Sequence, residues 1–108
     1  YPFVLCVAAT DKDDRPAWFS NRGPEVDLSA PGADIPALLP GGAVGTFSGT
    51  SFAAPHVSGT LALILSASPG LSRHEAVEVL LRTCEALEGE GFGKGLVNAA
   101  RAVAAVRP

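Results

Sequence analysis

The chain has 108 residues, of which 47% are hydrophobic and 18% are charged, a composition typical of one ordinary globular domain. The formal net charge is −3 and Lys and Arg form no cluster, which argues against nucleic acid as a partner because phosphate binding needs several converging basic groups. No run of 18 apolar residues occurs, so the sequence predicts no membrane-spanning segment and no membrane partner.

The first half of the chain carries strand and turn signals. Residues 3–9, FVLCVAA, form a continuous apolar run that predicts a strand covered on both faces in a parallel sheet. Short strands are expected at residues 17–20 and 26–30, between turns marked by Gly and Pro. Residues 34–39 predict an edge or irregular strand, because Pro36 cannot donate to a ladder. Since Tyr1 already lies at the start of the first expected strand, with no signal peptide before it, we expect a piece of a longer protein.

The second half predicts three helices. Apolar residues from Phe52 to about Ala67 cover nearly every side of a helix, which indicates a central helix buried all round. Pro55 falls near its first turn, where proline is tolerated. A capping box of Ser72 and Glu75 predicts the start of a second, amphipathic helix. The alanine-rich residues 97–106 predict a third, capped by Asn98. We see no internal repeat and no second domain.

The two cysteines, Cys6 and Cys84, lie in apolar contexts far apart in the sequence. One pair does not establish a disulfide framework. We expect two buried free thiols, since cysteine behaves as a small hydrophobic residue.

Ser51 lies where a glycine-rich segment runs into the central helix. A serine hydroxyl needs a base, a group that orients the base, and donors for the oxyanion before it can act as a nucleophile. At a helix N-terminus the Ser51 N–H would be unpaired and would carry the positive end of the helix dipole, and Gly49 would let the backbone approach an acyl group closely. The alternative is that Ser51 or Thr50 simply caps the helix. An α/β-hydrolase elbow fits less well, because that motif needs glycine where Ala53 stands.

The stretch GTSFAAPHVSG, residues 49–59, resembles the nucleophile signature of the subtilisin-like serine proteases. Three further stretches, YPFVLCVAATD, FSNRGPEVDLSAPGADI and GFGKGLVNAARAV, resemble other segments of that family. The resemblance covers essentially all of residues 1–108 and implies the C-terminal portion of a peptidase catalytic domain. The implied fold is the C-terminal part of a three-layer α/β fold, with a mainly parallel sheet and a buried central helix starting at Ser51. The implied activity is that of a serine endopeptidase acting on proteins or peptides, outside the cell. The implied site residues are Ser51 as nucleophile and Ser48, Gly49 and Thr50 in the oxyanion and substrate-side loop.

In this family the triad order is Asp, His, Ser. The resemblance therefore implies that the Asp, the His and the Asn of the oxyanion site precede Tyr1, and that this chain alone is inactive. We expect it to expose an unpaired strand edge or an apolar face to the missing N-terminal portion. His56 does not replace the base, since five residues place it about 140° around and ~7.5 Å along the helix from Ser51. By the resemblance we expect His56 to be a buried structural residue, and we expect His74 to face solvent.

Two further alternatives stay open. The chain could belong to a module that keeps the fold, has lost catalysis and serves in binding or structure, and the residues encoded before Tyr1 would decide this. Some family members also bind a cation near this part of the chain, which here would involve the carbonyls of Tyr1 and Val4 with Glu25 and Asp27. One or two hard ligands are too few for Ca²⁺, so we expect solvated carboxylates and no metal or cofactor held by this chain.

Overall fold

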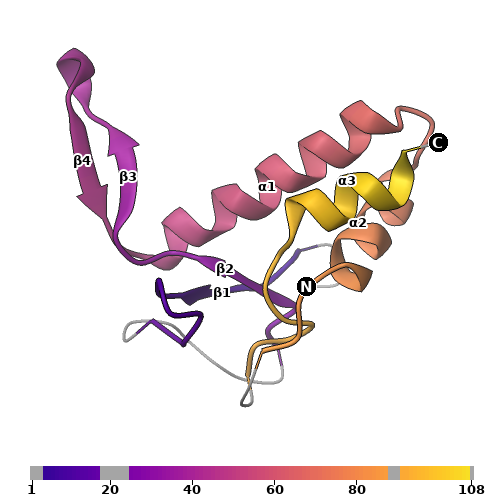
Figure 1. Cartoon of the computed structure of the whole chain (residues 1–108), viewed down its shortest axis with the longest axis horizontal. Coiled ribbons are helices and arrows are strands. Elements are labelled where there is room, and N and C mark those ends of the chain that lie inside the picture. Colours follow the sequence, from indigo (N-terminus) through magenta and orange to yellow (C-terminus); the bar gives the residue numbers. More distant parts are fainter. Residues whose placement is uncertain (1–3, 18–24, 88–90, 108) are drawn as a thin grey trace.

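A computed structural model describes residues 4–17, 25–87 and 91–107 of the chain. Within these residues the order of elements runs from strands to helices (Figure 1). The elements are β1 (Val7–Thr10), β2 (Leu28–Pro31), β3 (Ile35–Leu38), the 3₁₀ turn η1 (Pro40–Gly42), β4 (Val44–Phe47), α1 (Thr50–Ala67), α2 (Arg73–Arg82) and α3 (Ala99–Val106). The expected α/β class is confirmed.

β1 and β2 form a parallel pair in which Val7 lies opposite Leu28 and Thr10 opposite Pro31. Their inward residues are completely covered, with Ala9, Leu28 and Ala30 all 0% exposed. The strand is shorter than the apolar run at residues 3–9 predicts. It begins at Val7 because the preceding N–H, that of Cys6, donates to the Asp27 carboxylate at 2.7 Å. The expected strand at residues 17–20 lies mostly outside the described residues.

β3 and β4 form an antiparallel hairpin, with Ile35 opposite Phe47 and Leu38 opposite Val44. The hairpin projects away from the helices (Figure 1). Pro36 stands in a strand paired on one side only, as its missing N–H predicts. β4 was not predicted, because the glycines around Val44 indicate a turn. The tip of the hairpin is apolar and open, with Leu38 82% and Val44 66% exposed.

α1 packs one face against the parallel pair and against α2 and α3. The buried residues of this face are Ala53, Val57, Thr60 and Ile64. The opposite face, which includes Pro55, Ser58, Ala62 and Leu63, is exposed. The expectation of a helix buried all round is therefore met on one face only. Hydrophobic content on every side of a helix shows that it can be covered, but the packing partners decide which sides are covered.

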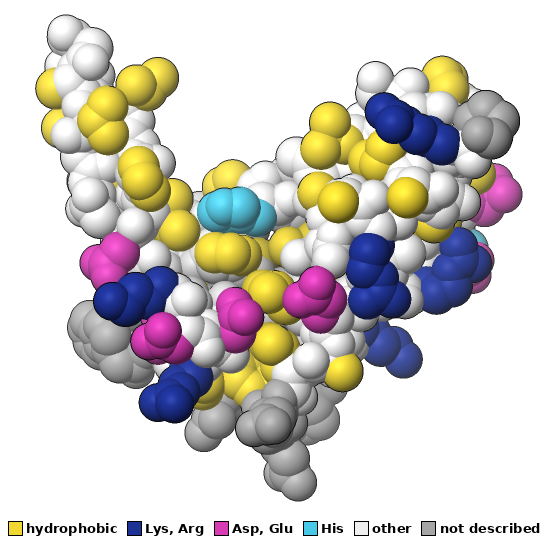
Figure 2. Space-filling view, viewed as in Figure 1, with side chains coloured by type: hydrophobic (Ala, Val, Ile, Leu, Met, Phe, Trp, Pro, Cys, Tyr) yellow, Lys and Arg dark blue, Asp and Glu magenta, His cyan; other side chains and the backbone are white. Residues whose placement is uncertain are grey.

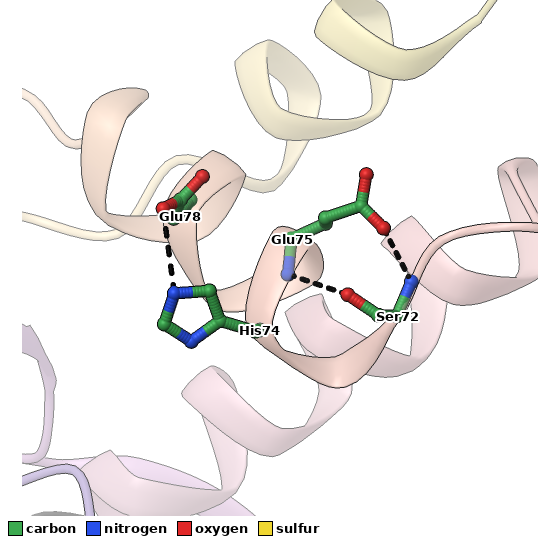
Figure 3. Close-up of polar contacts among 4 residues, drawn as sticks. All are labelled: Ser72, His74, Glu75 and Glu78. Atoms are coloured by element: carbon green, nitrogen blue, oxygen red, sulfur yellow. Dashed lines mark hydrogen bonds and ion pairs between the residues drawn. The ribbon is translucent and has the colours of Figure 1, made fainter.

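Local capping signals place the two shorter helices. The Ser72 hydroxyl accepts a hydrogen bond from the Glu75 N–H at 3.1 Å, and the Glu75 carboxylate accepts one from the Ser72 N–H at 3.0 Å (Figure 3). The Asn98 side chain accepts from the Arg101 N–H at 2.9 Å. Both predicted caps are confirmed. No helix among the described residues combines the length and apolar character needed to cross a bilayer.

Both cysteines are free, as expected, but only Cys84 is buried. Cys6 is exposed because it alternates with Leu5 and Val7, which pack against the core, so its side chain points the opposite way along the extended chain. The expectation of two buried thiols is thus wrong for Cys6. Burial raises the pKa of the Cys84 thiol above its ordinary value, and its Sγ lies 3.3 Å from the Leu80 carbonyl oxygen.

Candidate active site

Ser51 is the second residue of α1, and its side chain is exposed. The N-cap is Gly49, with φ 158° and ψ 157°, and no side chain caps the helix. Residues with a Cβ rarely adopt this conformation, so glycine suits the position. The alternative in which Ser51 or Thr50 is an ordinary helix cap is therefore wrong.

The amino end of α1 leaves backbone donors open. The Phe52 N–H donates a hydrogen bond to the Gly49 carbonyl at 3.0 Å. Among the described residues, neither the N–H nor the hydroxyl of Ser51 has a hydrogen-bond partner. The first turn holds no acidic side chain, so the helix itself supplies no charge that would neutralise the positive end of its 18 residues. An oxyanion next to Ser51 would meet an unpaired N–H and a favourable dipole.

The strands bring this helix end to the carboxyl edge of the parallel pair. Gly32 directly follows β2, its N–H donates to the Thr10 carbonyl at 3.0 Å, and its carbonyl accepts from the Gly49 N–H at 2.8 Å. In α/β proteins, ligands bind outside the carboxyl ends of the strands. Ser51 thus lies in the part of the fold where a reaction site is expected.

Two contacts close the loop that carries Ser51. The rings of Phe47, at the end of β4, and Phe52, in the first turn of α1, are stacked with centroids 5.4 Å apart and 10° between planes. The Ser48 hydroxyl accepts a hydrogen bond from the Asp34 N–H at 2.9 Å. Of the predicted loop residues, Ser48 and Thr50 are exposed and Gly49 is half-buried. No pattern in the sequence indicates the aromatic stack, because none shows that β4 ends at Phe47.

Neither histidine of the chain is placed as a base for Ser51. His56 is exposed, which corrects the expectation of a buried residue. Its Nδ1 lies 3.0 Å from the Phe52 carbonyl oxygen, which requires the proton on Nδ1 because a carbonyl only accepts. It is exposed because it lies on the α1 face that no described element covers. His74 faces solvent as predicted, 3.5 Å from Glu78 (Figure 3).

The acidic residues considered for a cation are differently engaged. The Asp27 carboxylate accepts the Cys6 N–H, and Glu25 is exposed. Tyr1 lies outside the described residues. No group of three or more His, Cys, Asp or Glu side chains suited to hold a metal occurs within the described ranges.

The surface beside the hairpin is apolar. Residues 35–72 contain no Asp, Glu, Lys or Arg. Figure 2 shows a hollow between the hairpin and the helices, with hydrophobic side chains on both sides of it. The exposed large hydrophobic residues of the hairpin and α1 are Leu38, Leu39, Val44 and Leu63.

An exposed serine at an uncapped helix N-terminus, at the carboxyl edge of parallel strands, is the arrangement of a candidate serine-hydrolase site. The chain belongs to the subtilase family (Peptidase_S8), whose family model matches residues 1–99. This confirms the resemblance drawn from the sequence motifs.

Individual relatives agree with the family. The chain is 43% identical over 100 residues to subtilisin E of Bacillus subtilis (strain 168), covering 91% of this chain and 26% of the relative. It is 43% identical over 113 residues to an extracellular protease of Xanthomonas campestris pv. campestris, covering 94% and 20%. Among solved structures, a protease from Pseudoalteromonas arctica PAMC 21717 superposes with a TM-score of 0.87 at 33% identity, covering 95% of this chain and 36% of that one. MycP1 from Mycobacterium smegmatis superposes with a TM-score of 0.82 at 28% identity, covering 94% and 30%. The chain spans about a quarter of the length of subtilisin E.

Proposed function

We propose that this chain supplies the nucleophile, Ser51, of a serine endopeptidase whose remaining catalytic groups lie in sequence that precedes residue 1. The observation that carries the proposal is that the Ser51 N–H and hydroxyl, at the uncapped start of α1, have no hydrogen-bond partner in the part of the chain that the structure describes. Ser51 lies within the segment that the subtilase family model matches. Family membership supports serine protease chemistry, and the geometry supports Ser51 as its nucleophile.

The proposed reaction is acyl transfer in two halves. Ser51 Oγ attacks the carbonyl carbon of the scissile peptide bond while an upstream His takes its proton, and an upstream Asp orients that His. The Ser51 N–H and an upstream Asn amide hold the oxyanion. The protonated His then gives its proton to the leaving amine, and water releases the acyl group from Ser51 by the same route. Ser48, Gly49 and Thr50 form the loop along which the substrate lies.

The exposed face of α1 supports a role for the upstream part of the domain. Pro55, Ser58, Ala62 and Leu63 form an uncharged surface on an otherwise well-packed helix, and an exposed apolar face of this kind is typical of a surface that another element covers. We propose that the N-terminal portion of the same domain covers it and carries the base to Ser51. The chain alone would then be inactive, because losing the base removes most of the rate enhancement. Since a relative at 43% identity is named an extracellular protease, we propose that the protein acts outside the cell on proteins or peptides.

The test is peptide hydrolysis by the full-length protein and two serine variants. Ser51→Ala should lower kcat by roughly 10⁴-fold or more. Ser66→Ala is the control, since Ser66 is an exposed serine near the carboxyl end of α1, about 22 Å along the helix from Ser51. It should leave kcat unchanged. Equal activity of the Ser51→Ala variant and the unmodified protein would refute Ser51 as nucleophile.

A module that has lost catalysis predicts a different result. A folded full-length protein with no hydrolysis, and with the Asp, His or Asn of the upstream segments replaced, would establish that alternative. The sequence encoded before Tyr1 distinguishes the two functions directly.

A further inference from the structure

Gly32 links the parallel strands to the loop before Ser51. Its N–H is bonded to Thr10, the last residue of β1, and its carbonyl is bonded to the N–H of Gly49. Gly49 is the N-cap of α1 and stands two residues before Ser51. A single residue after β2 therefore connects the end of the sheet to the start of the loop that carries the proposed nucleophile.

Position 32 is occupied by glycine because the structure leaves no space there for a side chain. Its φ lies outside the left-handed region, so its backbone conformation is open to other residues. A Cβ there would stand 2.7 Å from the Ala9 Cβ, 2.9 Å from the Gly49 carbonyl oxygen and 3.1 Å from the Ala53 Cβ. Ala9 and Ala53 are both 0% exposed, so small side chains on β1 and α1 complete the close approach.

A second bond holds the neighbouring residue. The Asp34 N–H donates to the Ser48 hydroxyl at 2.9 Å, beside the bond between Gly32 and Gly49. Asp34 adopts a left-handed conformation with φ 54°, which turns the chain from β2 into the hairpin. The two residues that precede Thr50 and Ser51 are thus each tied to the turn that follows β2.

We propose that Gly32, together with the Asp34–Ser48 bond, positions Ser51 for attack. The inference rests on the proposed function. Gly32 touches no reacting atom, and it acts by setting how closely Gly49 approaches the sheet. The Gly49–Thr50 and Thr50–Ser51 peptides then fix the direction of the Ser51 N–H and the place of its hydroxyl.

The expected size of the effect follows from the contacts. A Cβ at Gly32 must move the Gly49 carbonyl from 2.9 Å to the ordinary contact distance of 3.4 Å, a shift of about 0.5 Å. Because Ala53 is buried in the first turn of α1, the helix stays in place, and the loop before Ser51 moves instead. A misplacement of 1 Å at a reacting group costs on the order of 10²-fold in rate, so Gly32→Ala should lower kcat by about tenfold. The KM should change as well, because the loop that moves also lies along the substrate, so kcat per titrated site is the quantity that reports the position of Ser51.

The experiment compares Gly32→Ala with Ile64→Val in the full-length protein. Ile64 is buried in α1, 13 residues and about 20 Å from Ser51 along the helix, and its truncation to valine lowers the stability of the protein without touching the loop. Active-site titration with a fluorophosphonate gives kcat for each functional site, which loss of folded protein does not change. We expect Gly32→Ala to lower this kcat about tenfold and Ile64→Val to leave it unchanged. An unchanged value for Gly32→Ala, with only reduced stability, would overturn the inference and show a packing role alone.

A rescue variant and a milder variant complete the test. Ala9→Gly combined with Gly32→Ala removes the 2.7 Å contact and lets residue 32 shift toward β1, so it should restore most of the lost kcat.

If Gly32→Ala gives no folded protein, Ser48→Ala removes the bond to Asp34 without adding bulk, and it should lower kcat about threefold by the loss of one positioning bond. An unchanged kcat in Ser48→Ala would then overturn the inference. If the unmodified protein takes up no fluorophosphonate at Ser51, the proposed function and this inference both fail, whereas uptake with normal kcat in Gly32→Ala refutes the inference alone.

Discussion

Replacing Ser72 with alanine isolates the stability that the capping box gives α2. The substitution removes the bond from the Glu75 N–H to the Ser72 hydroxyl and leaves the reverse bond, from the Ser72 N–H to the Glu75 carboxylate, able to form. Ser72 is exposed, so little buried surface changes. The loss of one N-cap bond costs about 1 kcal/mol at neutral pH.

The effect should depend on pH through Glu75. Its pKa is lowered from the ordinary value of 4.5, first by the bond from the Ser72 backbone, then by the Ser72 side chain, with a smaller contribution from the His74 charge. A carboxyl whose pKa is lowered by folding stabilises the folded state above its unfolded pKa and loses this contribution as the pH falls through the folded pKa. The bond from the Ser72 backbone remains in Ser72→Ala, so this part of the pH dependence is common to both proteins, and only the contribution of the Ser72 side chain to the pKa separates them. The difference in stability between Ser72→Ala and the unmodified protein should therefore be largest at pH 7 and should narrow slightly below pH 4.5.

The assay is denaturant unfolding of the full-length protein, with amide hydrogen exchange of the α2 peptides as the local measurement. Ser66→Ala is the control, because Ser66 is an exposed serine within α1 and alanine favours a helix interior. Faster exchange in α2 is expected for Ser72→Ala only. Equal exchange in the two variants at neutral pH, or a difference that grows as the pH falls below 4.5, would refute the reasoning.

Two further predictions concern single positions. Gly95→Ala should destabilise the protein by about 2–3 kcal/mol or more, because Gly95 has φ 113° and a Cβ there collides with the Glu85 carbonyl. Thermal unfolding measures this loss of stability. The control is Gly70→Ala, which should show no comparable loss because nothing lies within 4 Å of a Cβ at Gly70. The Cys6 thiol should react with a disulfide reagent in the native state. The Cys84 thiol should react only after denaturation, because Cys84 is buried and its pKa is raised. Reaction of both thiols before denaturation would contradict this prediction.

Features fixed by neighbouring residues could be predicted from the sequence. The capping box needs only Ser72 and Glu75, three residues apart, and the Asn98 cap needs only Arg101, so both helix starts agreed with the structure. The apolar run at residues 3–9 gave the right strand but the wrong start. Its pairing depends on Leu28 opposite Val7 and on the Asp27 side chain that takes the Cys6 N–H, which are contacts across more than 20 residues.

Features decided by distant contacts were missed. The glycines near Val44 favour a turn, yet pairing with β3 makes residues 44–47 a strand. The sequence motif identified Ser51 as a candidate. The close approach of Gly32 to Ala9, Gly49 and Ala53 was not predicted, because it arises only when three separate segments fold together. Exposure of His56 follows from the absence of a covering element on one face of α1 in the described residues, which the composition of the helix does not show.

The most direct test of the central claim is the site of covalent labelling in the full-length protein. A fluorophosphonate reacts with a serine hydroxyl only when that serine is activated as a nucleophile. After labelling, peptide mass spectrometry should find the adduct on Ser51, and prior replacement by Ser51→Ala should abolish it. Properly folded full-length protein with no adduct on Ser51, or with the adduct on another serine, would contradict the account.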